Sequence, residues 1–205
     1  MLLLILIMKF PRGPVFSIIL PFKKNEDIDF FSLKNYINFL YKRGARVFYV
    51  MPYNSRFSVL NLKEIIEVNI FCVKTIKKLS KKNYFIAADP IHCSTNETIR
   101  LCNLFKKKGA DACSLIFGEK YYSDRQVYEH FKSISKKTNL DLFLHQQEFE
   151  KGIYNNKKKH YSINLLNKIL SLKNFIGMKE DSKIDLYTNR IVKKFQLKKI
   201  ILTSG

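Results

Sequence analysis

The chain has 205 residues, of which 46% are hydrophobic and 14% aromatic, which is sufficient for one globular domain with a buried core. Its formal net charge of +20 raises nucleic acid or an acidic membrane surface as partners. The basic residues are spread along the chain, mostly near the ends of predicted helices, and form no single basic face. We therefore expect a solvated basic surface, with no nucleic-acid partner and no membrane partner.

Cysteine usage and the N-terminus indicate the compartment. The four cysteines form no C-x-x-C pair and no regular framework, which is typical of reduced thiols in a cytoplasmic protein. Residues 1–8 are apolar but too short to span a membrane, and neither a basic segment nor a small-residue cleavage site flanks them. We expect an N-terminal extension over residues 1–9 and one domain over residues 10–205.

Short apolar segments of strand length alternate with segments whose apolar residues recur at helical spacing. Strands are predicted at residues 15–20, 46–51, 84–88, 112–117, 141–144, 175–178 and 200–203. Helices are predicted at residues 29–41, 61–79, 95–108, 124–137, 162–170 and 184–195. Asn61 and Glu64 are spaced as a capping box, Thr95 is expected to cap the third helix, and Gly109 to end it.

Strands that are apolar throughout and alternate with helices predict a parallel sheet covered by helices, hence the α/β class. A doubly wound sheet normally carries a G-x-G-x-x-G loop after an early strand, and none is present. A (β/α)₈ TIM barrel instead gathers polar residues at the C-terminal ends of several strands, as this sequence does. About seven strands are present, so we expect an incomplete barrel that lacks the last helix-strand-helix portion.

Lys179 is the leading candidate for a catalytic residue. An apolar strand delivers it to the point where residues of the barrel mouth should lie, between Gly177 and the acidic and hydroxyl residues 180–182. Burial disfavours a charged ammonium and leaves part of the lysine as free amine, which can attack a carbonyl. The alternative is that Lys179 has no catalytic role and its amine simply extends into solvent.

The order of motifs resembles the dihydrodipicolinate synthase and N-acetylneuraminate lyase family of pyruvate-dependent class I aldolases, over residues 10–205. The motifs that carry this resemblance are Leu20-Pro21-Phe22, Ile28-Asp29, Leu60-Asn61-x-x-Glu64, Thr95-x-Glu97-Thr98-Ile99, Gly109-Ala110-Asp111, Tyr121-Tyr122 and Gly177-x-Lys179-Glu180-Asp181-Ser182. The resemblance implies a divergent, C-terminally truncated (β/α)₈ barrel and places the Schiff-base lysine at Lys179. It implies no cofactor, a 2-oxo acid substrate and a homo-oligomer.

Two loops depart from the family pattern. The G-T-T-G-E loop that holds the pyruvate carboxylate is replaced by residues 52–56, in which Asn54, Ser55 and Arg56 can still bind a carboxylate. The Y-N-x-P segment, whose tyrosine shuttles protons, is replaced by His145-Gln146-Gln147-Glu148. The family's substrate-binding arginine falls near Glu150, which reverses the charge and argues against the lysine-biosynthetic substrate.

These observations predict a lyase in which Lys179 forms an imine with pyruvate or a related 2-oxo acid. His145 is expected to replace the missing phenol as proton carrier, because histidine titrates near neutral pH. Tyr122 is expected to reach the site from the fourth loop. Two alternatives stay open: a degenerate, non-catalytic barrel, and a metal-dependent aldolase or hydrolase with Asp89, His92 and His145 as ligands.

Overall fold

The computed structural model describes residues 13–50, 60–88, 93–146 and 160–203. Within these residues the strands form one seven-stranded sheet in the order β1-β2-β3-β4-β5-β6-β7, and every neighbouring pair is parallel. The strands are β1 (Val15–Ile18), β2 (Val47–Val50), β3 (Tyr84–Ala88), β4 (Ala112–Leu115), β5 (Asp141–Gln146), β6 (Phe175–Glu180) and β7 (Ile200–Thr203). Sequential order excludes the doubly wound sheet and confirms the incomplete (β/α) barrel.

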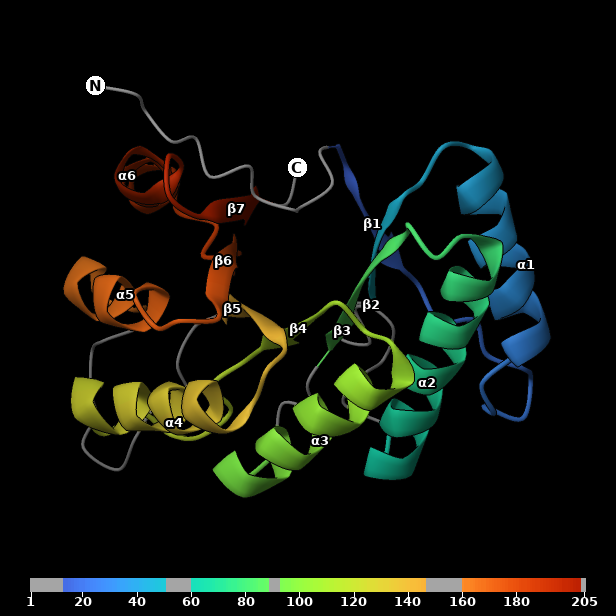
Figure 1. Cartoon of the computed structure of the whole chain (residues 1–205), viewed down its shortest axis with the longest axis horizontal. Helices are drawn as coiled ribbons and strands as arrows, with labels where there is room; N and C mark the ends of the chain where they lie inside the picture. Colours follow the sequence, from blue (N-terminus) through green and yellow to red (C-terminus); the bar gives the residue numbers. More distant parts are fainter. Residues whose placement is uncertain (1–12, 51–59, 89–92, 147–159, 204–205) are drawn as a thin grey trace.

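The sheet curls, with the helices on its outer, convex side and with β1 and β7 at its two edges (Figure 1). The helices are α1 (Phe30–Lys42), α2 (Leu62–Leu79), α3 (Thr95–Lys108), α4 (Asp124–Lys137), α5 (Ile163–Leu170) and α6 (Asp185–Phe195). None of the helices in the described part of the chain has the length and apolarity that a membrane span requires.

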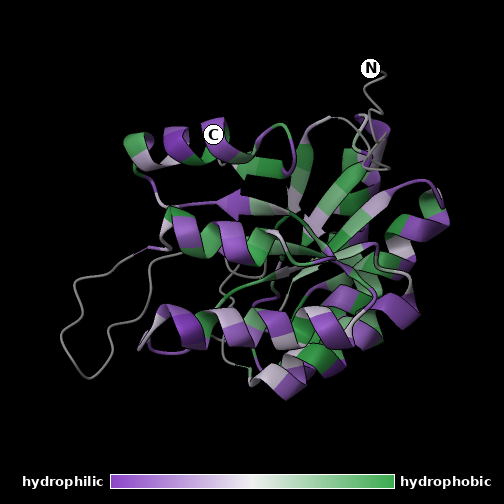
Figure 2. Cartoon of the chain, turned by 60° about the vertical axis from the view of Figure 1, so that its left-hand side comes forward, coloured by the Kyte–Doolittle hydropathy of each residue, from purple (hydrophilic) through white to green (hydrophobic). Residues whose placement is uncertain are grey.

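Two apolar clusters divide the core between the faces of the sheet. The larger cluster fills the space between the strands and the helices and includes Phe48, Leu144 and Met178. The smaller cluster lies on the concave face and includes Val47, Tyr49, Ile86, Ala112 and Phe143. Figure 2 shows that the strands are largely hydrophobic, whereas the helices carry both hydrophobic and hydrophilic residues. Alternate residues of one strand therefore belong to different faces.

The helix boundaries follow from local capping. Asn61 Oδ1 accepts the Glu64 backbone N–H at 3.0 Å and Glu64 Oε2 accepts that of Asn61 at 2.8 Å, which confirms the capping box. Gly109 ends α3 in the left-handed conformation, as predicted. The prediction for Thr95 was wrong by one residue: Ser94 caps α3, because its hydroxyl accepts the Glu97 backbone N–H at 3.2 Å.

The strands β5 and β6, which carry His145 and Lys179, are longer than the apolar pattern predicted. β5 extends to Gln146 and β6 to Glu180, and His145 pairs in register with Lys179. The apolar pattern ended too early because the final residues of each strand are polar yet buried. Both candidate residues thus lie within strands, where the sheet hydrogen bonds hold their backbone in place.

Candidate active site

Four strands contribute polar side chains to the concave face. On β6, Met178 packs toward the helices, so Lys179 takes the opposite face. The same alternation puts His145 of β5, Ser114 of β4 and Tyr49 of β2 on the concave face, next to the apolar residues of the smaller cluster. All four are at least 90% buried, with exposed fractions of 7% or less.

Lys179 contacts two ionisable side chains. Its Nζ donates to Asp181 Oδ2 at 2.7 Å and lies 3.2 Å from His145 Nε2. Asp181 Oδ2 is also 3.6 Å from His145 Nε2, so the amine, imidazole and carboxylate form a triangle. Because both the lysine and histidine side chains are buried, their mutual electrostatic interactions are weakly screened by solvent.

His145 is neutral near neutral pH. Burial lowers the pKa of its imidazole below the ordinary value, and the charge of Lys179 acts in the same direction, while the nearby carboxylate of Asp181 opposes both. A neutral imidazole has one nitrogen that can accept a proton. Beside an ammonium, such a nitrogen is placed to act as a general base.

Tyr49 and Ser114 extend the site across the concave face. Tyr49 Oη donates to Ser114 Oγ at 2.8 Å and lies 3.4 Å from His145 Nδ1. Burial raises the pKa of Tyr49 above its ordinary value, so the side chain remains a phenol. Neither residue was predicted from the sequence, although a tyrosine in an inward position of an apolar strand was a usable signal.

The turn after β6 is fixed from the helix side of the sheet. Glu180 Oε1 accepts the Ser182 backbone N–H at 2.8 Å, and Glu180 Oε2 accepts the Thr188 hydroxyl at 2.5 Å. Glu180 is itself buried. Since it is anchored to α6, it fixes the chain direction at the next residue, and this brings Asp181 back toward the amine of Lys179.

Gly177 allows the strands beside the site to approach closely. A Cβ at this position would lie 2.3 Å from the Ile200 carbonyl oxygen and 2.9 Å from Cε1 of Phe143. Phe143 is fully buried and pairs in register with Gly177. The absence of a side chain at Gly177 therefore provides the space that the Phe143 ring occupies on the concave face.

A family model for the dihydrodipicolinate synthetase family matches residues 11–205, nearly the whole chain. The chain belongs to this family. The resemblance predicted from the motifs is thereby confirmed.

The relatives of this chain include proteins named 4-hydroxy-tetrahydrodipicolinate synthase. The protein of Karelsulcia muelleri is 25% identical over 97% of this chain and 64% of its own length. That of Buchnera aphidicola subsp. Schizaphis graminum is 27% identical over 95% of this chain and 63% of its own length. The chain thus spans less than two thirds of the length of these relatives.

Solved structures of the family share the fold. Dihydrodipicolinate synthase from Acinetobacter baumannii, complexed with pyruvate, superposes with a TM-score of 0.77 at 20% identity, over 94% of this chain and 63% of that one. N-acetylneuraminate lyase from Mycoplasma synoviae superposes with a TM-score of 0.74 at 22% identity, over 92% and 61%. These likenesses establish the barrel architecture of the family member.

The structure brings together two of the predicted site residues, Lys179 and His145. Tyr122 is 49% exposed, and its backbone N–H donates to Gln126 Oε1 at 3.0 Å. No hydrogen bond in the described part of the chain joins Tyr122 to Lys179 or His145. The predicted carboxylate-binding residues Asn54, Ser55 and Arg56 lie outside the described residues.

The metal-site alternative depends on residues that the structure does not describe. Asp89 and His92 lie outside the described ranges, and so does Glu150. Among residues 13–50, 60–88, 93–146 and 160–203, no group of three or more His, Cys, Asp or Glu side chains is arranged to hold a metal ion. His145 is instead occupied by Lys179 and Tyr49.

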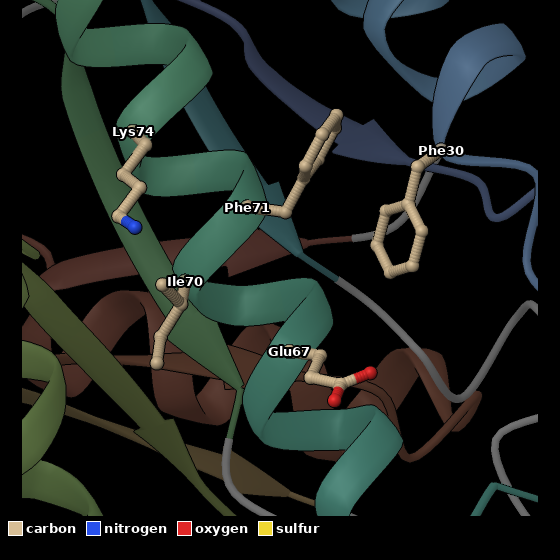
Figure 3. A pocket seen from close by; sticks show the side chains of 5 residues that line it. All are labelled: Phe30, Glu67, Ile70, Phe71 and Lys74. Carbon is tan, nitrogen blue, oxygen red and sulfur yellow. The ribbon is translucent and has the colours of Figure 1, made fainter.

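An apolar pocket of about 300 Å³ lies in the helix layer, apart from the site around Lys179 (Figure 3). It is lined by Phe30, at the start of α1, and by Glu67, Ile70, Phe71 and Lys74 of α2. The rings of Phe30 and Phe71 pack with centroids 4.8 Å apart. It contributes no side chain to the site around Lys179.

Proposed function

We propose that this chain forms a Schiff base between Lys179 and pyruvate or a related 2-oxo acid, as a class I aldolase-type lyase. The observation that carries the proposal is the buried amine of Lys179, with His145 Nε2 at 3.2 Å and Asp181 Oδ2 at 2.7 Å. Family membership supports it, and so does the Acinetobacter baumannii relative, whose structure contains pyruvate.

Imine formation requires proton transfer to and from the amine. In the proposed first step, His145 Nε2 takes a proton from the ammonium of Lys179, and the N–H electron pair remains on Nζ. The free amine then adds to C2 of the 2-oxo acid, and the carbonyl oxygen becomes the hydroxyl of a carbinolamine. The imidazolium returns its proton to this hydroxyl, water leaves, and a cationic imine remains.

The carboxylate of Asp181 has a separate part in this proposal. The imine nitrogen carries the positive charge that the ammonium carried before, and Asp181 stays within ion-pair distance of it. Loss of a proton from C3 of the bound acid to His145 converts the cationic imine into a neutral enamine. The enamine carbon can then attack a second carbonyl, and the reverse sequence breaks the same carbon-carbon bond.

The proposal extends to substrate binding, domain organisation and assembly. Asn54, Ser55 and Arg56 are proposed to bind the substrate carboxylate, and Tyr122 to approach the site from the β4–α4 loop. The proposal also includes a single barrel domain over residues 10–205, preceded by an extension at residues 1–9. We further propose that the protein is cytoplasmic and forms a homo-oligomer. Light scattering measures the molar mass and hence the oligomeric state.

Exchange of the methyl protons of pyruvate tests the proposal without knowledge of the second substrate. In D₂O, reversible enamine formation replaces the C3 protons by deuterium, which proton NMR follows directly. The wild-type chain should catalyse this exchange and Lys179→Arg should abolish it, since a guanidinium forms no imine with a 2-oxo acid. Lys168→Arg, at an exposed position of α5, is the matched control and should exchange normally. Wild-type exchange that survives in Lys179→Arg would overturn the proposal.

A chelator distinguishes the metal-dependent alternative. Exchange through a lysine imine needs no divalent ion, so activity should persist in excess EDTA. Loss of exchange in EDTA with recovery on adding a divalent cation would favour the metal route. If the folded chain catalyses no exchange under any condition, the degenerate, non-catalytic reading is supported.

A further inference from the structure

The proposed chemistry uses Lys179, His145 and Asp181 but leaves a second set of buried contacts unexplained. Tyr49 Oη lies 3.4 Å from His145 Nδ1 and donates to Ser114 Oγ at 2.8 Å. Tyr49 is 4% exposed and Ser114 3% exposed, and they come from β2 and β4. The buried hydroxyl of Tyr49, bonded to Ser114, thus contacts the nitrogen of His145 that faces away from the amine.

The donor and acceptor roles along this chain of contacts depend on the groups that face the two nitrogens of His145: Lys179 and Asp181 at Nε2, and Tyr49 at Nδ1. An ammonium has only donors, so Lys179, at 3.2 Å, favours an unprotonated Nε2 of His145, whereas the carboxylate of Asp181, at 3.6 Å from the same nitrogen, favours a protonated one. A neutral imidazole with an unprotonated Nε2 carries its proton on Nδ1. Nδ1 faces Tyr49, whose oxygen can accept this proton because its own hydrogen is directed to Ser114.

In this tautomer all three hydrogen bonds run in one direction: from Lys179 Nζ to His145 Nε2, from His145 Nδ1 to Tyr49 Oη, and from Tyr49 Oη to Ser114 Oγ. The opposite tautomer would place an N–H of His145 against the ammonium and leave Nδ1 to compete for the tyrosine proton. Burial strengthens the preference for the Nδ1–H tautomer, because a polar group without a hydrogen-bond partner inside the barrel is not solvated by water.

We propose that Tyr49, anchored by Ser114, is a positioning residue that holds neutral His145 in the Nδ1–H tautomer and leaves Nε2 as the proton acceptor for Lys179. This inference rests on the proposed function for its consequence in catalysis. When Nε2 takes the proton, the bond from Nζ to hydrogen breaks and its electron pair stays on Nζ. The resulting imidazolium donates from Nδ1 to Tyr49, while Nε2 faces the carboxylate of Asp181 at 3.6 Å.

Nitrogen NMR of the protein labelled with ¹⁵N-histidine reads the tautomer directly, without substrate. We expect the wild-type His145 signals near neutral pH to show a protonated Nδ1 and an unprotonated Nε2. Tyr49→Phe should lose this pure signature and shift toward the Nε2–H form, and Ser114→Ala should shift less in the same direction. Tyr128→Phe, which removes a phenol from α4, is the control and should leave His145 unchanged.

A wild-type spectrum with the proton on Nε2 would overturn the inference, and so would a Tyr49→Phe spectrum identical to wild type. Ser114→Ala keeps the test decisive if Tyr49→Phe does not fold. The tautomer measurement does not depend on activity, so its outcome is separate from that of the exchange experiment with Lys179→Arg.

A kinetic measurement separates positioning from packing. Tyr49→Phe should lower the maximal rate of pyruvate methyl exchange by about 10-fold, with little change in KM, since it impairs proton transfer and not substrate binding. In the His145→Gln background the same substitution should have no further effect, because the group it positions is gone. An equal loss in both backgrounds would show that Tyr49 acts only through packing.

Discussion

The amine of Lys179 and the carboxylate of Asp181 lie 2.7 Å apart, and one residue, Glu180, stands between them in the sequence. Neighbours of this spacing in a continuing strand share a face, but β6 ends at Glu180 and the chain turns. Glu180, bound to Thr188 and to the Ser182 backbone, fixes that turn. The pair is thus a product of how β6 ends, and it gives the buried ammonium its counter-ion.

Asp181→Asn should destabilise the fold because it leaves the buried ammonium without a matching charge. The lysine and aspartate side chains are 8% and 18% exposed, so we expect a loss of about 2 kcal/mol in unfolding free energy. Urea denaturation measures it. In a Lys179→Met background, which has no ammonium, Asp181→Asn should cost about 0.5 kcal/mol or less. Equal costs in the two backgrounds would show that the pair is not coupled.

His145→Gln should slow imine chemistry without preventing it. Glutamine keeps a polar group near Lys179 but cannot carry a proton near neutral pH, so the exchange of pyruvate protons should fall about 100-fold. Borohydride should still trap some adduct on prolonged incubation, because the amine remains. An exchange rate within about threefold of wild type would rule out His145 as the proton carrier.

Gly177→Ala should strongly destabilise the sheet. The added Cβ would lie 2.3 Å from a backbone oxygen of β7, which cannot move aside as a flexible side chain does. We expect a loss of about 3 kcal/mol in unfolding free energy, measured by urea denaturation, as for other severe overpacking. A loss below about 1 kcal/mol would mean that β6 and β7 separate easily at this point.

His130 should make the fold sensitive to mild acid. Burial lowers the pKa of His130 to about 4, whereas the unfolded chain should titrate near 6.5. The unfolded state therefore binds more protons between these values, and stability present above pH 6.5 is lost as pH falls toward 4. His130 is partly exposed, so we expect this contribution to be roughly 2 kcal/mol.

The variant His130→Phe tests this, because the ring packs edge-to-face against Phe117 and Phe131 and a phenyl group can replace it there. Phe gives up the contact between Thr95 Oγ1 and His130 Nδ1, which should lower stability equally at all pH values. The difference between pH 7 and pH 4.5 should therefore be smaller in His130→Phe than in wild type. Identical pH dependence of the two proteins would assign the acid loss to other groups.

The sequence was sufficient for the architecture because each strand and helix is locally consistent. Apolar runs, the Asn61 capping box and the left-handed Gly109 mark the elements without tertiary information. Lys179 and His145 were predicted because each follows an apolar run with a reactive side chain. Their direct contact depends on the register of β5 with β6, which no local pattern contains.

Tyr49 and Ser114 were missed for a different reason. Each lies within a short strand, where a polar group is ordinarily interpreted as part of the core, and the two are 65 positions apart along the chain. Their contact exists only because the curled sheet directs side chains of β2 and β4 toward the same concave space. Asp181 was visible in the G-x-K segment, but its return toward the amine depends on the anchoring of Glu180 to α6.

The most direct measurement is to treat the chain with pyruvate and borohydride, digest it, and locate the reduced adduct by peptide mass spectrometry. Reduction of the imine leaves a stable secondary amine on the lysine that formed it. We predict a 1-carboxyethyl group on Lys179 alone, and none in the Lys179→Arg variant. Modification spread over exposed lysines such as Lys168, with Lys179 unmodified in a folded protein, would contradict the assignment of Lys179 as the Schiff-base residue.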